Sequence, residues 1–144
     1  VDFHGIIQKQ VDFREADLRG ADLTAADLRK ANFQSADFRE ARLIRVNYGK
    51  ADLTKAQLGN TDLSEARFRE TTLKDADLRC ADLRGAVDLT VEALRTVKTL
   101  YRTQLDEALH ATLMATDAPL FTKPVDTWHT MKTPFNVGKK DICE

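Results

Sequence analysis

The chain has 144 residues, the size of one domain, and a formal net charge of −1 at pH 7. This near-neutral balance gives no strong electrostatic preference for nucleic acid or membrane, and we expect no nucleic acid partner. No apolar run reaches the roughly 18 residues of a membrane-spanning helix, so we expect no membrane insertion. The sequence starts at Val1 with neither Met nor a signal-like segment, so we expect a fragment or a processed form.

Residues 1–85 form seventeen consecutive units of five residues without a slip in register. A small apolar residue or Thr usually comes first, and a large apolar residue comes third in every unit but one, where Gln8 stands. A period of five fits neither a helix nor a strand. The third residues can all be buried only if the chain turns after each unit in the same sense. The repeat therefore predicts a coiled chain whose coils stack into a solenoid.

The units in residues 16–40 and 76–85 resemble the A(D/N)LXX motif of the pentapeptide-repeat family, and the resemblance covers roughly residues 1–86. It implies an all-β solenoid, a right-handed quadrilateral β-helix in which four units make one coil. Seventeen units would then give about four coils, a rod on the order of 20 Å long.

With four units per coil, residues twenty apart stack into four core columns. The expected columns are Leu23, Leu43, Leu63 and Leu83, headed by Phe3; Leu28, Tyr48 and Phe68, headed by Gln8; Phe13, Phe33, Leu53 and Leu73; and Leu18, Phe38, Leu58 and Leu78. We expect Phe13 to stack on Phe33, and Tyr48 on Phe68. The hydroxyl of Tyr48 must find a partner or reach the surface.

The second and fourth residues of each unit should face outward, and many are Asp and Arg respectively. They flank the buried third residue, so an Asp and an Arg of one unit can reach each other. One interpretation is a solvated, self-neutralising surface in which each pair contributes less than about 1 kcal/mol. The other is a patterned ladder of charges for a partner.

The rhythm breaks after Gly85, and we expect a helical cap over residues 87–121. Thr90 is a plausible N-cap, and the apolar residues from Val91 to Tyr101 keep to one side of a helix. A second helix should start near Asp106 and end at Ala118-Pro119. These segments resemble the C-terminal helical cap of other pentapeptide-repeat proteins, and a cap would cover the open end of the solenoid.

Residues 122–144 should form an irregular tail, but Trp128 and Phe135 favour packing back along the rod. Cys80 and Cys143 are the two cysteines of the chain, and they either form one disulfide or stay as thiols. The tail is long enough to bring them together, and the bond would require an oxidising compartment.

No residue pattern points to catalysis. The three histidines, His4, His110 and His129, show no ligand spacing with one another or with the cysteines. No phosphate-binding or dinucleotide-binding motif is present either. We expect no catalytic residues, no cofactor and no metal, and therefore a protein that is not an enzyme.

Two functions remain from the sequence. The first is a rigid scaffold or protein–protein interaction module, expected to be monomeric, with an unknown protein partner. The second follows from the resemblance, because some family members mimic DNA and inhibit or protect DNA gyrase. Those members are acidic, whereas residues 1–85 hold fifteen Asp plus Glu and fifteen Lys plus Arg. The resemblance also extends to plant and cyanobacterial members, and implies a chloroplast thylakoid lumen location.

Overall fold

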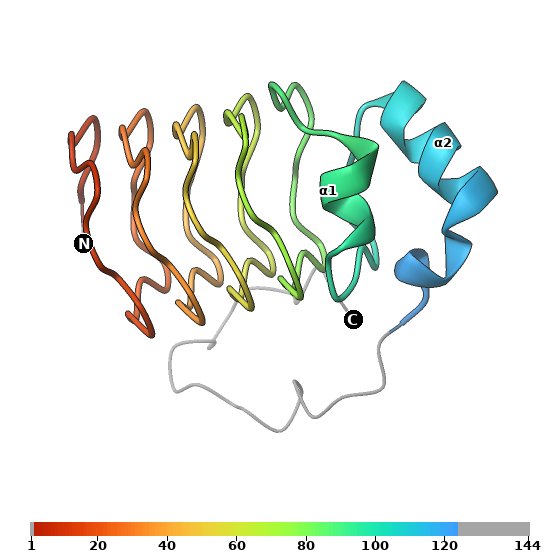
Figure 1. The fold of residues 1–144 in the computed structure, drawn as a ribbon, viewed down its shortest axis with the longest axis horizontal. Helices are drawn as coiled ribbons and strands as arrows, with labels where there is room; N and C mark the ends of the chain where they lie inside the picture. The colour runs from red at the N-terminus through yellow and green to blue at the C-terminus, as the bar shows by residue number, and fades with distance from the viewer. Residues whose placement is uncertain (1, 124–144) are drawn as a thin grey trace, which may run out of the picture.

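The computed structural model describes residues 2–123, and in them the backbone winds in coils that stack side by side (Figure 1). Isolated parallel bridges join residues twenty apart, from Asp2 with Asp22 through to Arg67 with Val87. The bridged residues are the second residues of the units. The spacing of twenty expected from four units per coil is therefore the spacing of the backbone ladder.

Each unit in the middle of the stack is bonded to the coil before it and the coil after it. In the unit 31–35, the Asn32 N–H donates to the carbonyl of Val11 at 2.8 Å, in the preceding coil. The Phe33 N–H donates to the carbonyl of Asp52 at 2.7 Å, in the following coil. Two neighbouring residues thus donate their N–H groups to coils on opposite sides. The main-chain polar groups are hydrogen-bonded in this way, while the side chains alternate between the inside and the outside of the coil.

The corner after each unit is tight. The Ala36 N–H donates to the carbonyl of Phe33 at 3.0 Å, which turns the chain into the next side of the coil. The fifth residue of the unit, Ser35, lies within this turn and has φ 58°, in the left-handed region. Most fifth residues in the repeat share this conformation without being Gly, at a conformational cost of about 1–2 kcal/mol each. The Ser35 N–H recovers a ladder bond to the carbonyl of Thr54 at 2.9 Å.

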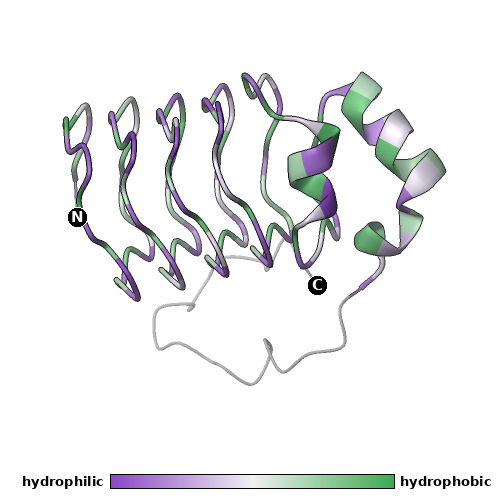
Figure 2. Ribbon diagram, in the orientation of Figure 1, coloured by the Kyte–Doolittle hydropathy of each residue, from purple (hydrophilic) through white to green (hydrophobic). Residues whose placement is uncertain are grey.

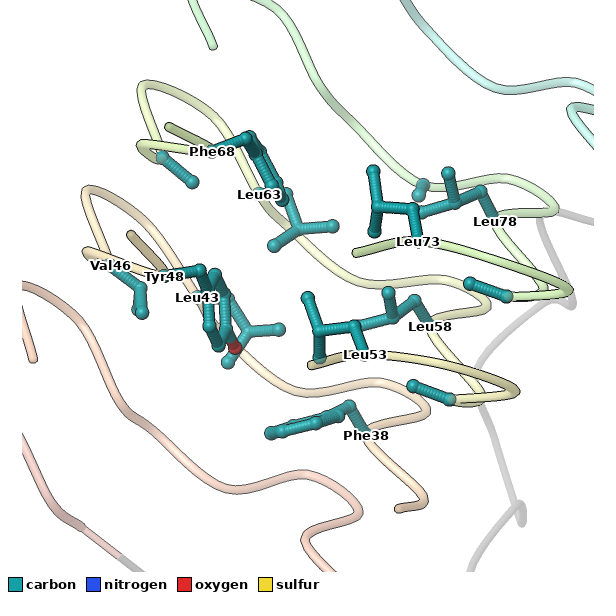
Figure 3. Packing of buried hydrophobic residues seen from close by; sticks show 14 of the residues in the cluster. Phe38, Leu43, Val46, Tyr48, Leu53, Leu58, Leu63, Phe68, Leu73 and Leu78 are labelled. Carbon is teal, nitrogen blue, oxygen red and sulfur yellow. The ribbon is translucent and has the colours of Figure 1, made fainter. Parts of the chain in front are cut away.

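The interior of the coil is filled by side chains (Figure 3). All third residues from Leu23 to Leu83 are at most 4% exposed. Phe13 and Leu18 are only half-buried, because they belong to the first coil, and among the described residues no coil stacks on their outer side. Gln8 is exposed in the same coil. Along each coil, hydrophobic and hydrophilic residues alternate over short distances (Figure 2).

Three helical elements follow the repeat: α1 (Val91–Arg95), α2 (Glu107–Thr116) and the 3-10 helix η1 (Ala118–Phe121). The N-cap of α1 is Thr90, as expected, and its hydroxyl accepts the Ala93 N–H at 3.1 Å. The prediction that this helix continues to Tyr101 is wrong, because α1 ends at Arg95.

After α1 the chain returns to the ladder. Thr99 bridges Asp77 and Gln104 bridges Asp82, each across twenty-two residues instead of twenty. The apolar Val97 is 5% exposed in this returning segment, where it packs on the core without being helical. Backbone pairing thus extends past residue 86, where the sequence motif ends. The division into residues 1–86, 87–121 and 122–144 stays a prediction.

Helix α2 lies at the end of the stack, beyond α1 (Figure 1). It starts next to Asp106, where a helix start was expected; Asp106 is its N-cap, but the Asp106 carboxylate makes no cap bond. It accepts instead the N–H of Gly85 at 3.0 Å, which ties the start of α2 to the last unit of the repeat. A second tie joins Arg95 of α1 to Asp117, with 2.8 Å between Nε and Oδ2.

Candidate interaction surface

The outward Asp and Arg side chains form a recurrent fork. In the unit 16–20, the Arg19 Nε donates to Asp17 Oδ1 at 2.8 Å, and the Arg19 Nη2 donates to Asp17 Oδ2 at 2.6 Å. The expected reach across the third residue is confirmed. The same Asp–Arg pairing recurs at Asp12, Asp27, Asp37, Asp77 and Asp82.

The Asp has a second role that the sequence analysis missed. Its Oδ1 also accepts the backbone N–H of the fourth residue, at 3.2 Å between Arg19 N and Asp17. Asn47 serves the backbone N–H of Gly49 in the same way at 3.1 Å, although no Arg is present in that unit. The signal was the repeated Asp or Asn at the second position, since these side chains often bond the backbone two residues on. The second position is therefore structural as well as charged.

The forks lower the pKa of their carboxyl groups. The side-chain hydrogen bond from Arg19, followed by the backbone bond from the same residue, lowers the pKa of Asp17 to about 2. The pKa values of Asp12, Asp27 and Asp82 are lowered as well, first by the hydrogen bond from the Arg two residues later. The carboxylates of these pairs are thus held in the charged form.

On one face of the rod, two of the Asp–Arg pairs are largely buried, although the sequence pattern predicts a solvated surface. The side chains of Asp77 and Arg79 pair with each other and are only 1% and 6% exposed. Those of Asp37 and Arg39, on the same face, are 22% and 16% exposed. By contrast, Arg14 on the neighbouring face is 59% exposed. The interpretation of every Asp–Arg pair as solvent-exposed is therefore wrong for these two pairs, whereas Asp17 and Arg19 on the same face are 60% and 36% exposed.

The aromatic stacks lie where the columns placed them. The rings of Phe13 and Phe33 are stacked with centroids 5.2 Å apart, and those of Tyr48 and Phe68 with centroids 6.0 Å apart. Tyr48 is fully buried, and its hydroxyl neither reaches the surface nor has a hydrogen-bond partner within residues 2–123. The expectation that the hydroxyl would be satisfied is thus contradicted. Burial raises the pKa of this hydroxyl.

The remaining candidate residues are spread over the molecule. His4 lies in the first coil. The ring of His110 in α2 packs edge-on against that of Phe121, with 5.2 Å between the ring centroids. Cys80 occupies a corner with φ 56°, and its N–H donates to the carbonyl of Tyr101 at 2.8 Å. Trp128, His129, Phe135 and Cys143 lie outside the described residues.

Residues 2–123 contain neither a cluster of metal-binding side chains nor a membrane-spanning helix. No group of three or more His, Cys, Asp or Glu side chains in this range could hold a metal ion. No helix in the same range is long and apolar enough to cross a bilayer.

Comparison with known proteins gives the family. The model of the family described as pentapeptide repeats matches residues 9–47 and 51–87, in eight copies. A comparison with curated proteins found no match.

Similar folds occur among solved structures. A pentapeptide repeat protein of Nostoc Pcc 7120 is 26% identical, with a TM-score of 0.54 over 73% of this chain and 80% of that one. A pentapeptide repeat protein of the Arabidopsis thaliana thylakoid lumen is 21% identical, with a TM-score of 0.52 over 78% of this chain and 77% of that one.

Proposed function

The chain belongs to the pentapeptide repeat family, and we propose that it acts as a rigid, non-catalytic protein–protein interaction module. The observation that carries this proposal is the rigid outer surface. Many outward Asp side chains accept the backbone N–H of the fourth residue of their unit, and those followed by Arg also pair with its guanidinium, as in Asp17 with the N–H and guanidinium of Arg19. A surface whose side chains are already ordered loses little conformational entropy when a partner binds.

The interior supports the same proposal. The square core is filled by side chains such as Phe33, Tyr48 and Leu53, each 0% exposed. The inside of the coil is thus used for stability, and recognition falls to the outside. In this account α1 and α2 cap the end of the stack. Leu113 of α2 packs into the core at 0% exposure, and the Asp106 carboxylate at the N-cap of α2 accepts the N–H of Gly85.

Cross-linking of the purified protein in an extract of the cells that make it tests this function. We expect one or a few proteins to be captured in a stable ratio by the folded protein, and not by the same protein carrying Phe33→Ala and kept above its unfolding temperature. Capture that does not depend on folding would contradict an interaction module built on a rigid surface.

DNA mimicry is the alternative, and the balance of fifteen acidic and fifteen basic residues in 1–85 speaks against it. A gyrase supercoiling assay separates the two functions. We expect no inhibition at micromolar protein; inhibition at that concentration would favour mimicry of DNA.

A thylakoid-lumen location and a Cys80–Cys143 disulfide belong to the same proposal. Cys80 lies at a corner of the last full set of units and is partly exposed, so its thiol is accessible to a second cysteine. Closing so long a loop would stabilise the fold by about 4 kcal/mol in the chain-entropy model. A free-thiol titration of the unreduced, denatured protein tests the bond. We expect no reactive thiol, and two thiols per chain would rule out both the bond and its support for an oxidising location.

A further inference from the structure

One face of the rod lacks most of the acidic half of the ladder. We call this the basic face: the outward side chains of units 6–10, 26–30, 46–50 and 66–70, with Val87 of the next coil. Bridges join its second positions into one column, which runs Ile7, Asp27, Asn47, Arg67 and Val87. Only one of these five residues is an Asp. The opposite face has Asp17, Asp37, Gln57 and Asp77 at the same positions.

The loss of acidic residues leaves a local excess of positive charge. Its four complete units carry six cations and two carboxylates: Lys9, Arg29, Lys30, Lys50, Arg67 and Arg69, with Asp27 and Glu70; a further carboxylate, Asp88, follows Val87. Residues 1–85 as a whole hold fifteen of each sign. The rod is thus neutral in sum, but this side of it is not.

The two carboxylates are each shared by two cations. Asp27 Oδ2 lies 2.8 Å from Arg29 Nη2 and 3.6 Å from Lys9 Nζ. Glu70 lies 3.5 Å from Lys50 Nζ, through Oε2, and 3.6 Å from Arg69 Nε, through Oε1. This sharing neutralises only part of the charge, and the Arg69 side chain stays 76% exposed.

Two more cations on the face form no ion pair in the described part of the chain. Lys30 and Arg67 are exposed, and neither forms an ion pair with any residue in 2–123. Arg67 stands where other units have the Asp that would fork with the fourth residue. The ammonium group of Lys30 and the guanidinium group of Arg67 are therefore available to bind an anionic group of a partner.

The apolar residues of the column point to the same surface. The large hydrophobic residues most exposed in the described chain are Ile7 at 69%, Val87 at 45% and Met114 at 44%. Two of the three lie at the opposite ends of this one column. Four ladder steps of about 4.8 Å place them roughly 19 Å apart, with the cations between them.

We propose that the basic face binds an acidic segment of a partner protein that carries apolar residues at both ends of its acidic stretch. This proposal rests on the proposed function of an interaction module and names the class of its partner. The cations match the acidic stretch, and Ile7 and Val87 match its ends. A nucleic acid has no apolar ends to offer, and the chain lacks the strongly basic balance typical of nucleic-acid-binding domains.

A synthetic peptide tests the charge match: a central run of Glu with Leu at each end, labelled for fluorescence anisotropy. We expect the wild-type protein to bind it more weakly as salt is raised, because exposed charges are screened. The double variant Lys30→Glu/Arg67→Glu should lose affinity about tenfold or more, since it replaces attraction by repulsion. Its matched control is Lys55→Glu/Lys74→Glu, which makes the same change in net charge at exposed residues of another face. The control should bind like the wild type.

A second pair of variants tests the apolar ends. Ile7→Ser/Val87→Ser should weaken peptide binding without changing its salt dependence, and a peptide with Ser in place of both Leu residues should not distinguish this variant from the wild type. Ile7 is mostly exposed, so its replacement removes little from the core. If Val87→Ser disturbs the last coil, Ile7→Ser alone still tests the amino-terminal end of the column.

Three results would overturn the proposal: no peptide binding by the wild type, an equal loss of affinity in the Lys55→Glu/Lys74→Glu control, or tighter binding of a DNA duplex than of the peptide. The proposed function is tested separately by cross-linking. If Lys30→Glu/Arg67→Glu still captures the partner that the wild type captures, the basic face is wrong and the interaction module stands. If the wild type captures no partner, the interaction module itself fails.

Discussion

The inward and outward residues of the same five-residue unit differ in how strictly the structure constrains them. From Leu23 to Leu83 the third residues vary among Leu, Phe and Tyr, yet all are at most 4% exposed. The outward charged side chains range from Asp77, 1% exposed, to Arg69, 76% exposed. The third residue of every unit must fill the same interior, whereas each outward residue is constrained only by the neighbours on its own face. The interior therefore determines stability, and the exterior is available for variation.

The largest effect should come from the interior. Phe33 is 0% exposed and contacts the rings of Phe13, Phe38 and Tyr48. Phe33→Ala should lower the free energy of unfolding by about 3–5 kcal/mol, because the cavity it leaves is closed by the coils on both sides. Denaturant unfolding measures this. A loss below about 1 kcal/mol would contradict the column assignment.

The second prediction concerns the most buried outward pair. Arg79→Ala should lower the free energy of unfolding by about 3 kcal/mol, because it leaves the buried carboxylate of Asp77 without its main counter-ion. Arg14→Ala, in an exposed pair of the same sequence pattern, is the control and should change stability by less than about 0.5 kcal/mol. Equal effects in the two variants would show that burial does not separate these faces.

One substitution in the interior should raise the free energy of unfolding. Tyr48 has a buried hydroxyl with no hydrogen-bond partner in the described chain, so Tyr48→Phe removes a polar group that is desolvated without compensation. We expect the free energy of unfolding to rise by about 1 kcal/mol. Thermal unfolding measures the change. A clear loss of stability would mean that the hydroxyl is satisfied after all.

The smallest effect should come from acid. The pKa of Asp17 is about 2 in the folded protein and about 3.9 when unfolded, so between these values the unfolded state binds more protons. The stability that Asp17 contributes should therefore be fully present above about pH 4 and be lost as pH falls toward 2. The other forked carboxyl groups act in the same direction. Unfolding of the wild type and of Asp17→Asn across this window checks the sign, since the variant should lose less stability on acidification.

Much of the interior could be predicted from the sequence. Once residues twenty apart were placed in columns, the burial of Leu43 and the stacking of Phe13 on Phe33 followed from the period alone. These predictions held because every third residue meets the same neighbours in the coils before and after it.

The parts that failed depend on more than the period. Val97 and Leu100 lie three residues apart, a spacing that fits a helical face and also fits the returning segment of the ladder, so α1 was predicted too long. The burial of Arg79 could not be predicted from the repeat, because Asp17 and Arg19 have the same pattern on the same face and are exposed. The charge excess of the basic face was missed because the charges were counted over the whole rod, where it cancels.

The most direct test of the division between interior and exterior is the free energy of unfolding of Lys30→Glu/Arg67→Glu, measured on the protein used for the peptide titration. Neither residue takes part in an ion pair within the described chain, so the account predicts a stability within about 0.5 kcal/mol of the wild type, together with the loss of peptide affinity. A fall of several kcal/mol in the free energy of unfolding would contradict the account, because the outward cations would then be supporting the fold instead of serving recognition.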